Sequence, residues 1–151
     1  MLKSLHHIGV AVQDMTRSLA FYRDKLGASV ALDLMMDLPE FGNGVGISNA
    51  KARIVFLQIP TMSSQLELIQ YISPSGRRIA PDSSSDTVGR MHAALQVIDI
   101  KSAYEALKAK GIEFVSKPSF FAADHPVLGG IGFCYFRDPD GALLELIQLP
   151  Q

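Results

Sequence analysis

The stretch Leu66-Glu67-Leu68-Ile69-Gln70 recurs without change as Leu144-Glu145-Leu146-Ile147-Gln148, 78 residues further along the chain. A second match lies upstream of each copy. Residues 7–15 and 92–100 both have histidine at the first position, valine at the sixth and aspartate at the eighth. Two matched segments in the same order indicate an internal repeat. The chain is therefore expected to contain two copies of one module, and the fold of that module decides the fold of the protein.

Each copy predicts the same local structure. In the first copy, residues 5–12 alternate and are rich in β-formers, which predicts a strand. Asp14 follows as a helix N-cap, and apolar residues at helical spacing continue to Leu26 before Gly27 ends the helix. The second copy repeats these elements in the same order, with a strand over 92–97, a cap at Asp99 and a helix stop at Gly111.

Short strands are expected after each helix, over 29–36, 54–59 and 65–71 in the first copy and over 113–115, 132–136 and 143–149 in the second. The turn Asp138-Pro139-Asp140-Gly141 precedes the last strand. The predicted fold class is α+β, with two tandem βαβββ modules in a single domain, 1–151. Module one spans about 1–72, a Ser- and Pro-containing connector about 73–86, and module two about 87–151.

Composition narrows the class of protein. The chain has 151 residues, 48% hydrophobic and 19% charged, which is globular composition. A net charge of −1 argues against a nucleic-acid partner, and no apolar run is long enough to span a membrane. The first residues lead directly into a strand pattern, so we expect no signal peptide. Cys134 has no partner for an internal disulfide and is expected to be a buried, unreactive thiol, which favours a cytoplasmic location.

The repeat selects four candidate metal ligands. Because successive strand residues point to opposite faces, His7 lies opposite the row that packs on the helix, and His92 does the same in its own copy. His6 falls on the helix-packing row and is excluded. Glu67 and Glu145 stand between leucines, where an ionised carboxylate is costly unless it is paired or binds a metal.

Each of these residues also has a simpler interpretation. A single strand histidine is more often a core or surface residue than a ligand, and a single strand glutamate usually faces water. The duplication favours the metal, because each module supplies one histidine and one glutamate at matching positions. We therefore predict one divalent ion bound by His7, Glu67, His92 and Glu145. Zn, Fe, Mn, Co and Ni all remain possible with these ligand types.

Three segments carry a resemblance to a known family: LHHIGVAVQDMTRSLAFYRDKLG at 5–27, MHAALQVIDI at 91–100 and FRDPDGALLELIQ at 136–148. Together they resemble the vicinal-oxygen-chelate superfamily, which includes glyoxalases, bleomycin resistance proteins and extradiol dioxygenases. The resemblance implies a glyoxalase-like fold in which the two modules form an open eight-stranded cup around a metal. The family's ligand positions match the same four residues. The resemblance also implies a homodimer, with the metal site within one chain or across two.

The resemblance implies a reaction class as well. A glyoxalase-type isomerase, epimerase or lyase acts on a small oxygen-rich substrate through a metal-bound enolate, with Glu145 or Glu67 as the base. One alternative is an Fe(II) extradiol-type dioxygenase, which uses two histidines and one carboxylate and is disfavoured by the additional ligand Glu67. The other alternative is a non-enzymatic small-molecule binding module of the antibiotic-resistance type, which is disfavoured by the complete ligand set.

Further residues are candidates for substrate contact. Arg77 and Arg78 are suited to a carboxylate or phosphate, or are solvated loop charges. His125 is placed on a loop near the rim of the expected cup, and Tyr135 on a strand that borders it. The glycine-containing segment 33–51 is expected to be a loop that closes over the substrate or lies at the dimer contact.

Overall fold

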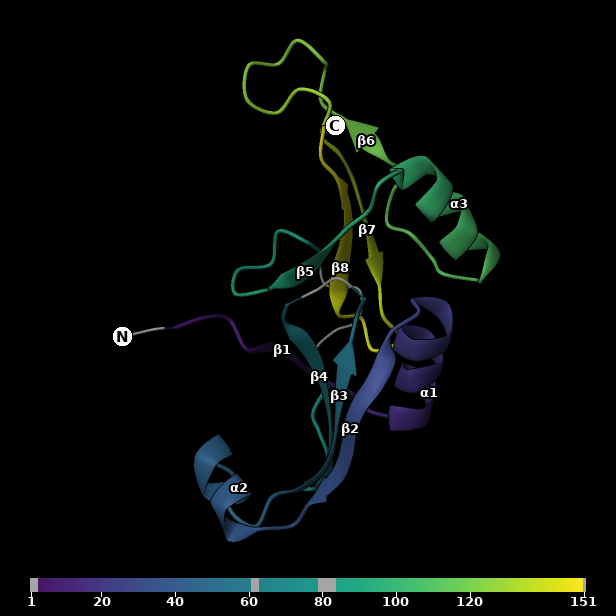
Figure 1. The fold of residues 1–151 in the computed structure, drawn as a ribbon. Coiled ribbons are helices and arrows are strands. Elements are labelled where there is room, and N and C mark those ends of the chain that lie inside the picture. The colour runs from purple at the N-terminus through teal and green to yellow at the C-terminus, as the bar shows by residue number, and fades with distance from the viewer. Residues whose placement is uncertain (1–2, 61–62, 79–83, 151) are drawn as a thin grey trace. The chain divides into compact units, whose positions relative to one another are not determined.

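The computed structural model describes residues 3–60, 63–78 and 84–150, and the chain divides into two compact units, 1–79 and 80–151 (Figure 1). The first module contains β1 (His7–Ala11), α1 (Met15–Leu19), the π-helix η1 (Ala20–Lys25), β2 (Ser29–Met36), α2 (Pro39–Val45), β3 (Lys51–Gln58) and β4 (Gln65–Ser73). The second contains β5 (His92–Gln96), α3 (Ile100–Ala109), β6 (Ser119–Phe120), β7 (Gly132–Arg137) and β8 (Leu143–Gln148). The boundary between the units falls at residues 79–80, within the expected connector, of which 79–83 lie outside the described residues.

The two sheets have the same topology. Their strand orders are β1-β4-β3-β2 and β5-β8-β7-β6. The first and last strands of each module pair in parallel, and the remaining pairs are antiparallel. A parallel pair needs a crossover connection, which the helix of each module begins. The predicted βαβββ modules are confirmed, whereas the joining of both sheets into one cup stays a prediction.

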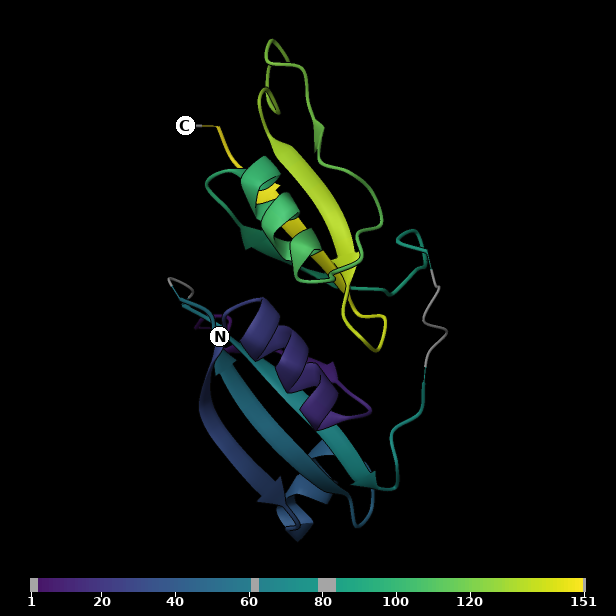
Figure 2. The ribbon, with the colours of Figure 1, turned by 90° about the vertical axis from the view of Figure 1, so that its right-hand side faces the viewer.

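Each sheet has one face that packs on its helix and one face that carries the histidine. Figure 2 shows α1 and α3 each lying across their own sheet. Leu66 and Leu68 are buried on the helix side of β4, as are Leu144 and Leu146 on β8. We call these sides the helix faces and the opposite sides the histidine faces. Alternation along the LELIQ stretch therefore places its leucines in the core and its glutamate on the other side of the sheet.

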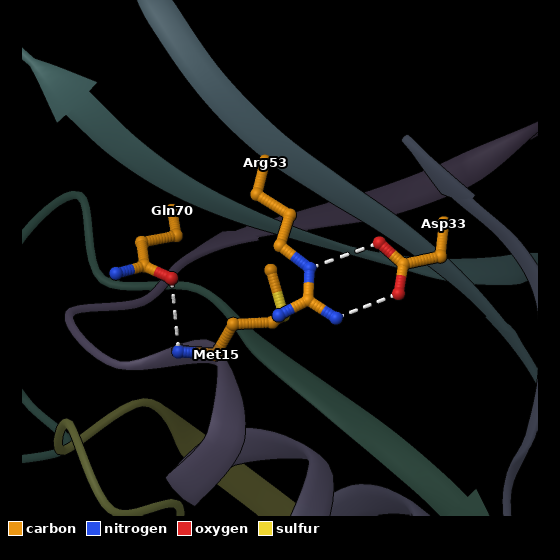
Figure 3. Close-up of polar contacts among 4 residues, drawn as sticks. All are labelled: Met15, Asp33, Arg53 and Gln70. Carbon is orange, nitrogen blue, oxygen red and sulfur yellow. Dashed lines mark hydrogen bonds and ion pairs between the residues drawn. The ribbon is translucent and has the colours of Figure 1, made fainter. Parts of the chain in front are cut away.

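The glutamine that ends each LELIQ stretch holds the helix to the sheet. The side-chain oxygen of Gln70 accepts a hydrogen bond from the backbone N–H of Met15 at 3.1 Å, which Figure 3 shows. In the second module the Gln148 oxygen accepts from Ile100 N–H at 2.9 Å. Both donors belong to the first helical residue, whose N–H has no partner within the helix. This repeated contact explains why the repeat conserves glutamine in both copies.

A second polar contact lies beside the first on the same helix face. Figure 3 shows the Arg53 guanidinium donating to both carboxylate oxygens of Asp33, at 2.9 and 2.7 Å. This hydrogen bonding lowers the pKa of Asp33. Both side chains are about one third exposed, at 33% and 38%. An exposed ion pair of this kind contributes little to stability, so the burial of leucines and the glutamine contacts dominate the helix face.

The expected first helix is present but changes its hydrogen-bonding pattern. It is α-helical to Leu19 and continues as a π-helix from Ala20 to Lys25. The wider turn allows the adjacent residues Phe21 and Tyr22 both to be buried. Helical spacing in the sequence predicts only one of these two aromatic residues on the packing face.

The segment 33–51 is not only a loop, which corrects the expectation. It contains the end of β2 and the helix α2, with Pro39 in its first turn. Gly46 ends the helix in the left-handed conformation at φ 70°. The ring of Phe41 stacks on Tyr71 of β4 at 6.1 Å, so α2 is held against the sheet. The glycines of this segment, Gly42 and Gly44, obscured its helix in the sequence because glycine is a poor helix former.

The prediction of a strand over 113–115 is also wrong. Phe114 forms only an isolated bridge with Phe136, and Val115 N–H donates to the Tyr135 carbonyl at 2.7 Å. Strand pairing resumes at β6, over Ser119–Phe120. Pro118 lies directly between the two segments and has no N–H to donate, which interrupts the ladder. The edge strand is therefore shorter and later than the sequence pattern predicts.

We expect Gln148→Leu to lower the free energy of unfolding by about 1–2 kcal/mol, because the partly buried N–H of Ile100 loses its acceptor. Urea denaturation of the full chain measures the change. Gln96→Leu is the matched control, since Gln96 is exposed on β5, and it should change stability by less than about 0.5 kcal/mol. Equal effects of the two substitutions would contradict a helix-holding role for Gln148.

Candidate metal centre

The first module brings His7 and Glu67 together on its histidine face. His7 Nε2 lies 3.1 Å from Glu67 Oε2, and the Glu67 side chain is only 13% exposed. The parallel register pairs Gly9, two residues after His7, with Glu67. A Cβ atom at Gly9 would lie 3.4 Å from Glu67 Oε2, so glycine leaves open space beside this carboxylate. We call these two residues the first His–Glu pair.

His6 contacts this pair from the side. Its Nδ1 lies 2.8 Å from Nδ1 of His7, and the two rings meet edge-on with centroids 5.1 Å apart. His6 is exposed rather than packed against the helix, which corrects the expectation from strand alternation, because β1 begins only at His7. The contact occupies Nδ1 of His7 and leaves Nε2 directed at Glu67. A partner on the remote nitrogen is the arrangement that orients metal-binding histidines in general.

The second module repeats the arrangement. His92 Nε2 lies 2.9 Å from Glu145 Oε2, and the Glu145 side chain is 10% exposed. Ala94 takes the place of Gly9 in the register, opposite Glu145. We call His92 and Glu145 the second His–Glu pair. Each histidine and its glutamate thus come from the first and last strands of one module, as the repeat predicts.

An aromatic ring lies against each histidine. Phe56 meets His7 edge-on at 5.5 Å, and Tyr135 meets His92 edge-on at 5.2 Å. The two rings are equivalent, since Phe56 pairs with Glu67 in the β3–β4 ladder and Tyr135 with Glu145 in the β7–β8 ladder. Sequence reasoning missed Phe56. Aligning the strands that precede the two LELIQ stretches could have found it.

Tyr135 differs from Phe56 by its hydroxyl group. Burial of that hydroxyl, followed by the negative charge of Glu145 and a hydrogen bond to the same carboxylate, raises the pKa of Tyr135. The tyrosine is therefore protonated at neutral pH. Tyr135 thus lies against the ring of His92 and opposite Glu145 in the β7–β8 ladder.

The chemistry of the two pairs fits a divalent metal. Imidazole nitrogen and carboxylate oxygen are suitable ligands for Zn, Fe, Mn, Co and Ni. Both carboxylates are largely buried and each lies against a histidine, which also favours a cation. Within residues 3–60, 63–78 and 84–150, no group of three or more His, Cys, Asp or Glu side chains is close enough to hold a metal. Each module thus presents two candidate ligands, and the set of four stays a prediction.

The remaining candidates lie outside these pairs. Arg77 and Arg78 are exposed in the segment that follows β4. His125 is exposed on the loop before β7, where its Nδ1 accepts the backbone N–H groups of Val127 and Leu128 at 3.3 and 3.1 Å. The substrate contacts expected of His125, Arg77 and Arg78 stay predictions. No helix in the described part of the chain is long and apolar enough to cross a membrane.

Comparison with known proteins gives the family. The model of the Glyoxalase/Bleomycin resistance protein/Dioxygenase superfamily matches residues 4–146. A 2-epi-5-epi-valiolone epimerase from an Actinomyces species is 32% identical, over 97% of this chain and 80% of that protein. The ethylmalonyl-CoA/methylmalonyl-CoA epimerase of Cereibacter sphaeroides is 29% identical, over 99% of this chain and 100% of its own length. A glyoxalase family protein from Bacillus cereus superposes with a TM-score of 0.84 at 18% identity, covering 98% of this chain and 95% of that one, which confirms the glyoxalase-like fold.

Cys134 lies on the helix face of β7, opposite Leu146 of β8, and is fully buried. Burial, followed by the charge of Glu145, raises the pKa of Cys134 to about 11. We expect a disulfide reagent at pH 8 to label the folded protein at least about 100-fold more slowly than the urea-unfolded chain, because the thiolate is scarce and covered. Rapid labelling of the folded protein would show that Cys134 is accessible.

Proposed function

Because this chain belongs to the glyoxalase/bleomycin resistance protein/dioxygenase superfamily, we propose that its two His–Glu pairs bind one divalent metal and that it moves a proton on a small oxygen-rich substrate. The chain is an isomerase-type enzyme of this superfamily, as the epimerase relatives show. The observation that carries the proposal is the duplicated pair, with nitrogen and oxygen 3.1 Å apart in one module and 2.9 Å apart in the other.

The proposed ligands are Nε2 of His7 and His92 and one carboxylate oxygen each from Glu67 and Glu145. They come from one chain or from two chains of a homodimer. When bound, a divalent metal supplies Lewis-acid stabilisation of negative charge on a carbonyl oxygen of the substrate.

One of the two glutamates is the proposed general base. One of the two carboxylates accepts a proton from the carbon next to the substrate carbonyl, the C–H bond breaks, and its electron pair moves onto the carbonyl oxygen as an enolate. Water then supplies a proton to the opposite side of that carbon, which inverts its configuration, and the glutamate releases the proton it accepted to solvent. The histidines hold the centre and take no proton in this scheme. Such general-base catalysis contributes about 10²–10⁴-fold to a rate.

The two relatives suggest substrate classes. One acts on 2-epi-5-epi-valiolone and the other on ethylmalonyl-CoA and methylmalonyl-CoA, according to their names. We propose a substrate of one of these classes, in which an acidic C–H lies beside a carbonyl. Arg77, Arg78 and His125 are the proposed contacts to its polar groups, and a cytoplasmic location is proposed for the reaction. An extradiol dioxygenase is disfavoured, because such an enzyme uses two histidines and one carboxylate, whereas this chain offers two glutamates.

Metal analysis tests the centre. We expect about one divalent ion per chain in protein purified without an affinity tag, and its loss in the double variant His7→Ala, His92→Ala. Inductively coupled plasma mass spectrometry measures the content. The control is His125→Ala, which should keep the metal. A parent that takes up no divalent ion even after reconstitution would refute the centre and favour a binding module.

Solvent exchange tests the reaction. The protein is incubated in D₂O with methylmalonyl-CoA or 2-epi-5-epi-valiolone, and NMR follows the incorporation of deuterium. We expect deuterium at the carbon beside the carbonyl in the substrate of the correct class. At least one of Glu67→Gln and Glu145→Gln should reduce the exchange rate by about 100-fold or more. Glu105→Gln changes an exposed glutamate on α3 and should leave the rate unchanged. Full exchange activity in both site variants would contradict a glutamate base.

A further inference from the structure

A row of aromatic rings leads away from the second His–Glu pair within its own module. Tyr135 meets His92 edge-on with centroids 5.2 Å apart, and Phe133 meets Tyr135 edge-on at 6.1 Å. Phe121 stacks on Phe133 at 5.6 Å, and His125 lies tilted against Phe121 at 5.9 Å. We call Tyr135, Phe133 and Phe121 the aromatic row. It connects the proposed ligand His92 to His125 on the loop before β7.

The aromatic row lies on the histidine face of the second sheet. Cys134 and Phe136 alternate with its two β7 members and are fully buried on the helix face. Phe133 and Tyr135 are only half-buried, and so is Phe121. Partly exposed rings offer apolar surface that a ligand can cover, and small-molecule sites are lined mainly by such side chains. The aromatic row is therefore a candidate wall of the substrate site.

Phe133 is a departure from the repeat. It pairs with Ile147 of the second LELIQ stretch, and Ile54 pairs with Ile69 at the same place in the first. Ile54 is buried, at 4% exposure. An aliphatic side chain thus satisfies this position in one module, whereas the other module carries a larger, half-buried ring. The fold of the module does not require the ring, which favours a role in ligand binding.

His125 lies at the far end of the aromatic row, and its hydrogen bonds fix which nitrogen is protonated. Nδ1 accepts the backbone N–H groups of Val127 and Leu128, at 3.3 and 3.1 Å. In the neutral ring the proton is therefore on Nε2, which is a donor. The loop is closely packed, since Gly129 N–H donates to the His125 carbonyl at 3.1 Å and a Cβ at Gly129 would lie 2.5 Å from the Ala123 carbonyl oxygen. His125 thus presents a donor from a well-defined position.

The length of the aromatic row distinguishes between two kinds of substrate. Two residues along a strand span roughly 7 Å, and a neighbouring chain segment adds about 5 Å across the sheet. A compact polyol at the second His–Glu pair would cover Tyr135 and leave Phe133 and Phe121 uncovered. An extended apolar arm would cover all three rings, and a polar atom further along the arm would reach His125.

We propose that the aromatic row binds an apolar arm of the substrate and that His125 donates a hydrogen bond from Nε2 to an acceptor oxygen further along that arm. This inference rests on the proposed function and narrows its substrate. The acidic C–H and its carbonyl lie at one end of the molecule, and the arm carries a second carbonyl. Acyl thioesters with a long arm have this form, and compact polyols do not. Phe133 and Phe121 are then specificity-determining residues.

Binding of two malonates tests the aromatic row. Malonate and hexylmalonate share the dicarboxylate end and differ in the apolar arm, and calorimetric titration of the Co²⁺-loaded protein measures both affinities. We expect hexylmalonate to bind the parent at least about 10-fold more tightly, because the arm covers ring surface. Phe133→Ala and Phe121→Ala should each reduce this ratio to below about threefold and change malonate binding by less than about twofold.

Phe120→Ala is the matched control. Phe120 directly precedes Phe121 but lies on the helix face, where its ring lies against Gly132 and Lys101 Nζ is 5.4 Å from its centroid. Its removal should keep the ratio within about twofold of the parent. Thermal unfolding of each variant shows that folded proteins are compared. A ratio that falls equally in all three variants would contradict the aromatic row as the binding surface.

An arm with a terminal acceptor tests His125. Hexylmalonate is compared with the analogue whose arm ends in a carboxamide. His125→Ala should weaken binding of the carboxamide about 3–10-fold and that of hexylmalonate by less than about twofold, because only the carboxamide has an acceptor for Nε2–H. Equal weakening of both compounds would show that His125 only maintains the loop, and would overturn its role as a donor.

The outcomes separate this inference from the proposed function. Parent protein that takes up Co²⁺ but binds hexylmalonate no more tightly than malonate, or binds neither, overturns the arm site and leaves the metal centre intact. Parent protein that takes up no Co²⁺ refutes the proposed function, and the inference with it.

Discussion

The parallel pairing of the first strand of each module with its last strand is the interaction on which the other features depend. It aligns Gly9 with Glu67 and Ala94 with Glu145, which places each histidine diagonally beside its glutamate. A parallel pair cannot be joined by a tight turn, so the chain must cross over, and the helix of each module begins that crossing. The helix then covers one face of the sheet and leaves the other to the His–Glu pair.

The last strand serves both faces at once. Leu144 and Leu146 are almost fully buried against the helix side, while Glu145 between them is 8% exposed on the other. A carboxylate in such surroundings is costly unless it has a partner, and His92 supplies one. Stability and the proposed chemistry are therefore carried by alternate residues of a single strand, with no separate loop needed to hold the site.

The sequence predicts most of this arrangement because the repeat and strand alternation are local patterns. β2 over Ser29–Met36, the caps Asp14 and Asp99, and both His–Glu pairs follow from them. What the sequence could not predict depends on longer-range packing. The widened turn at η1, the helix α2 and the late start of β6 each result from contacts or interruptions that a residue pattern does not record. Phe56 was missed because a lone strand phenylalanine has the appearance of a core residue.

The conservation of LELIQ between the two copies has a consequence for molecular evolution. Four of its five positions have an identified contact: the leucines fill the core, the glutamate faces the histidine, and the glutamine holds the helix. Only the glutamate belongs to the proposed metal centre, and the others are needed for folding. A descendant that loses the glutamate can therefore keep the rest of the motif and its fold. Retention of the leucines and the glutamine is evidence of shared ancestry, and within this motif only the glutamate belongs to the proposed metal centre.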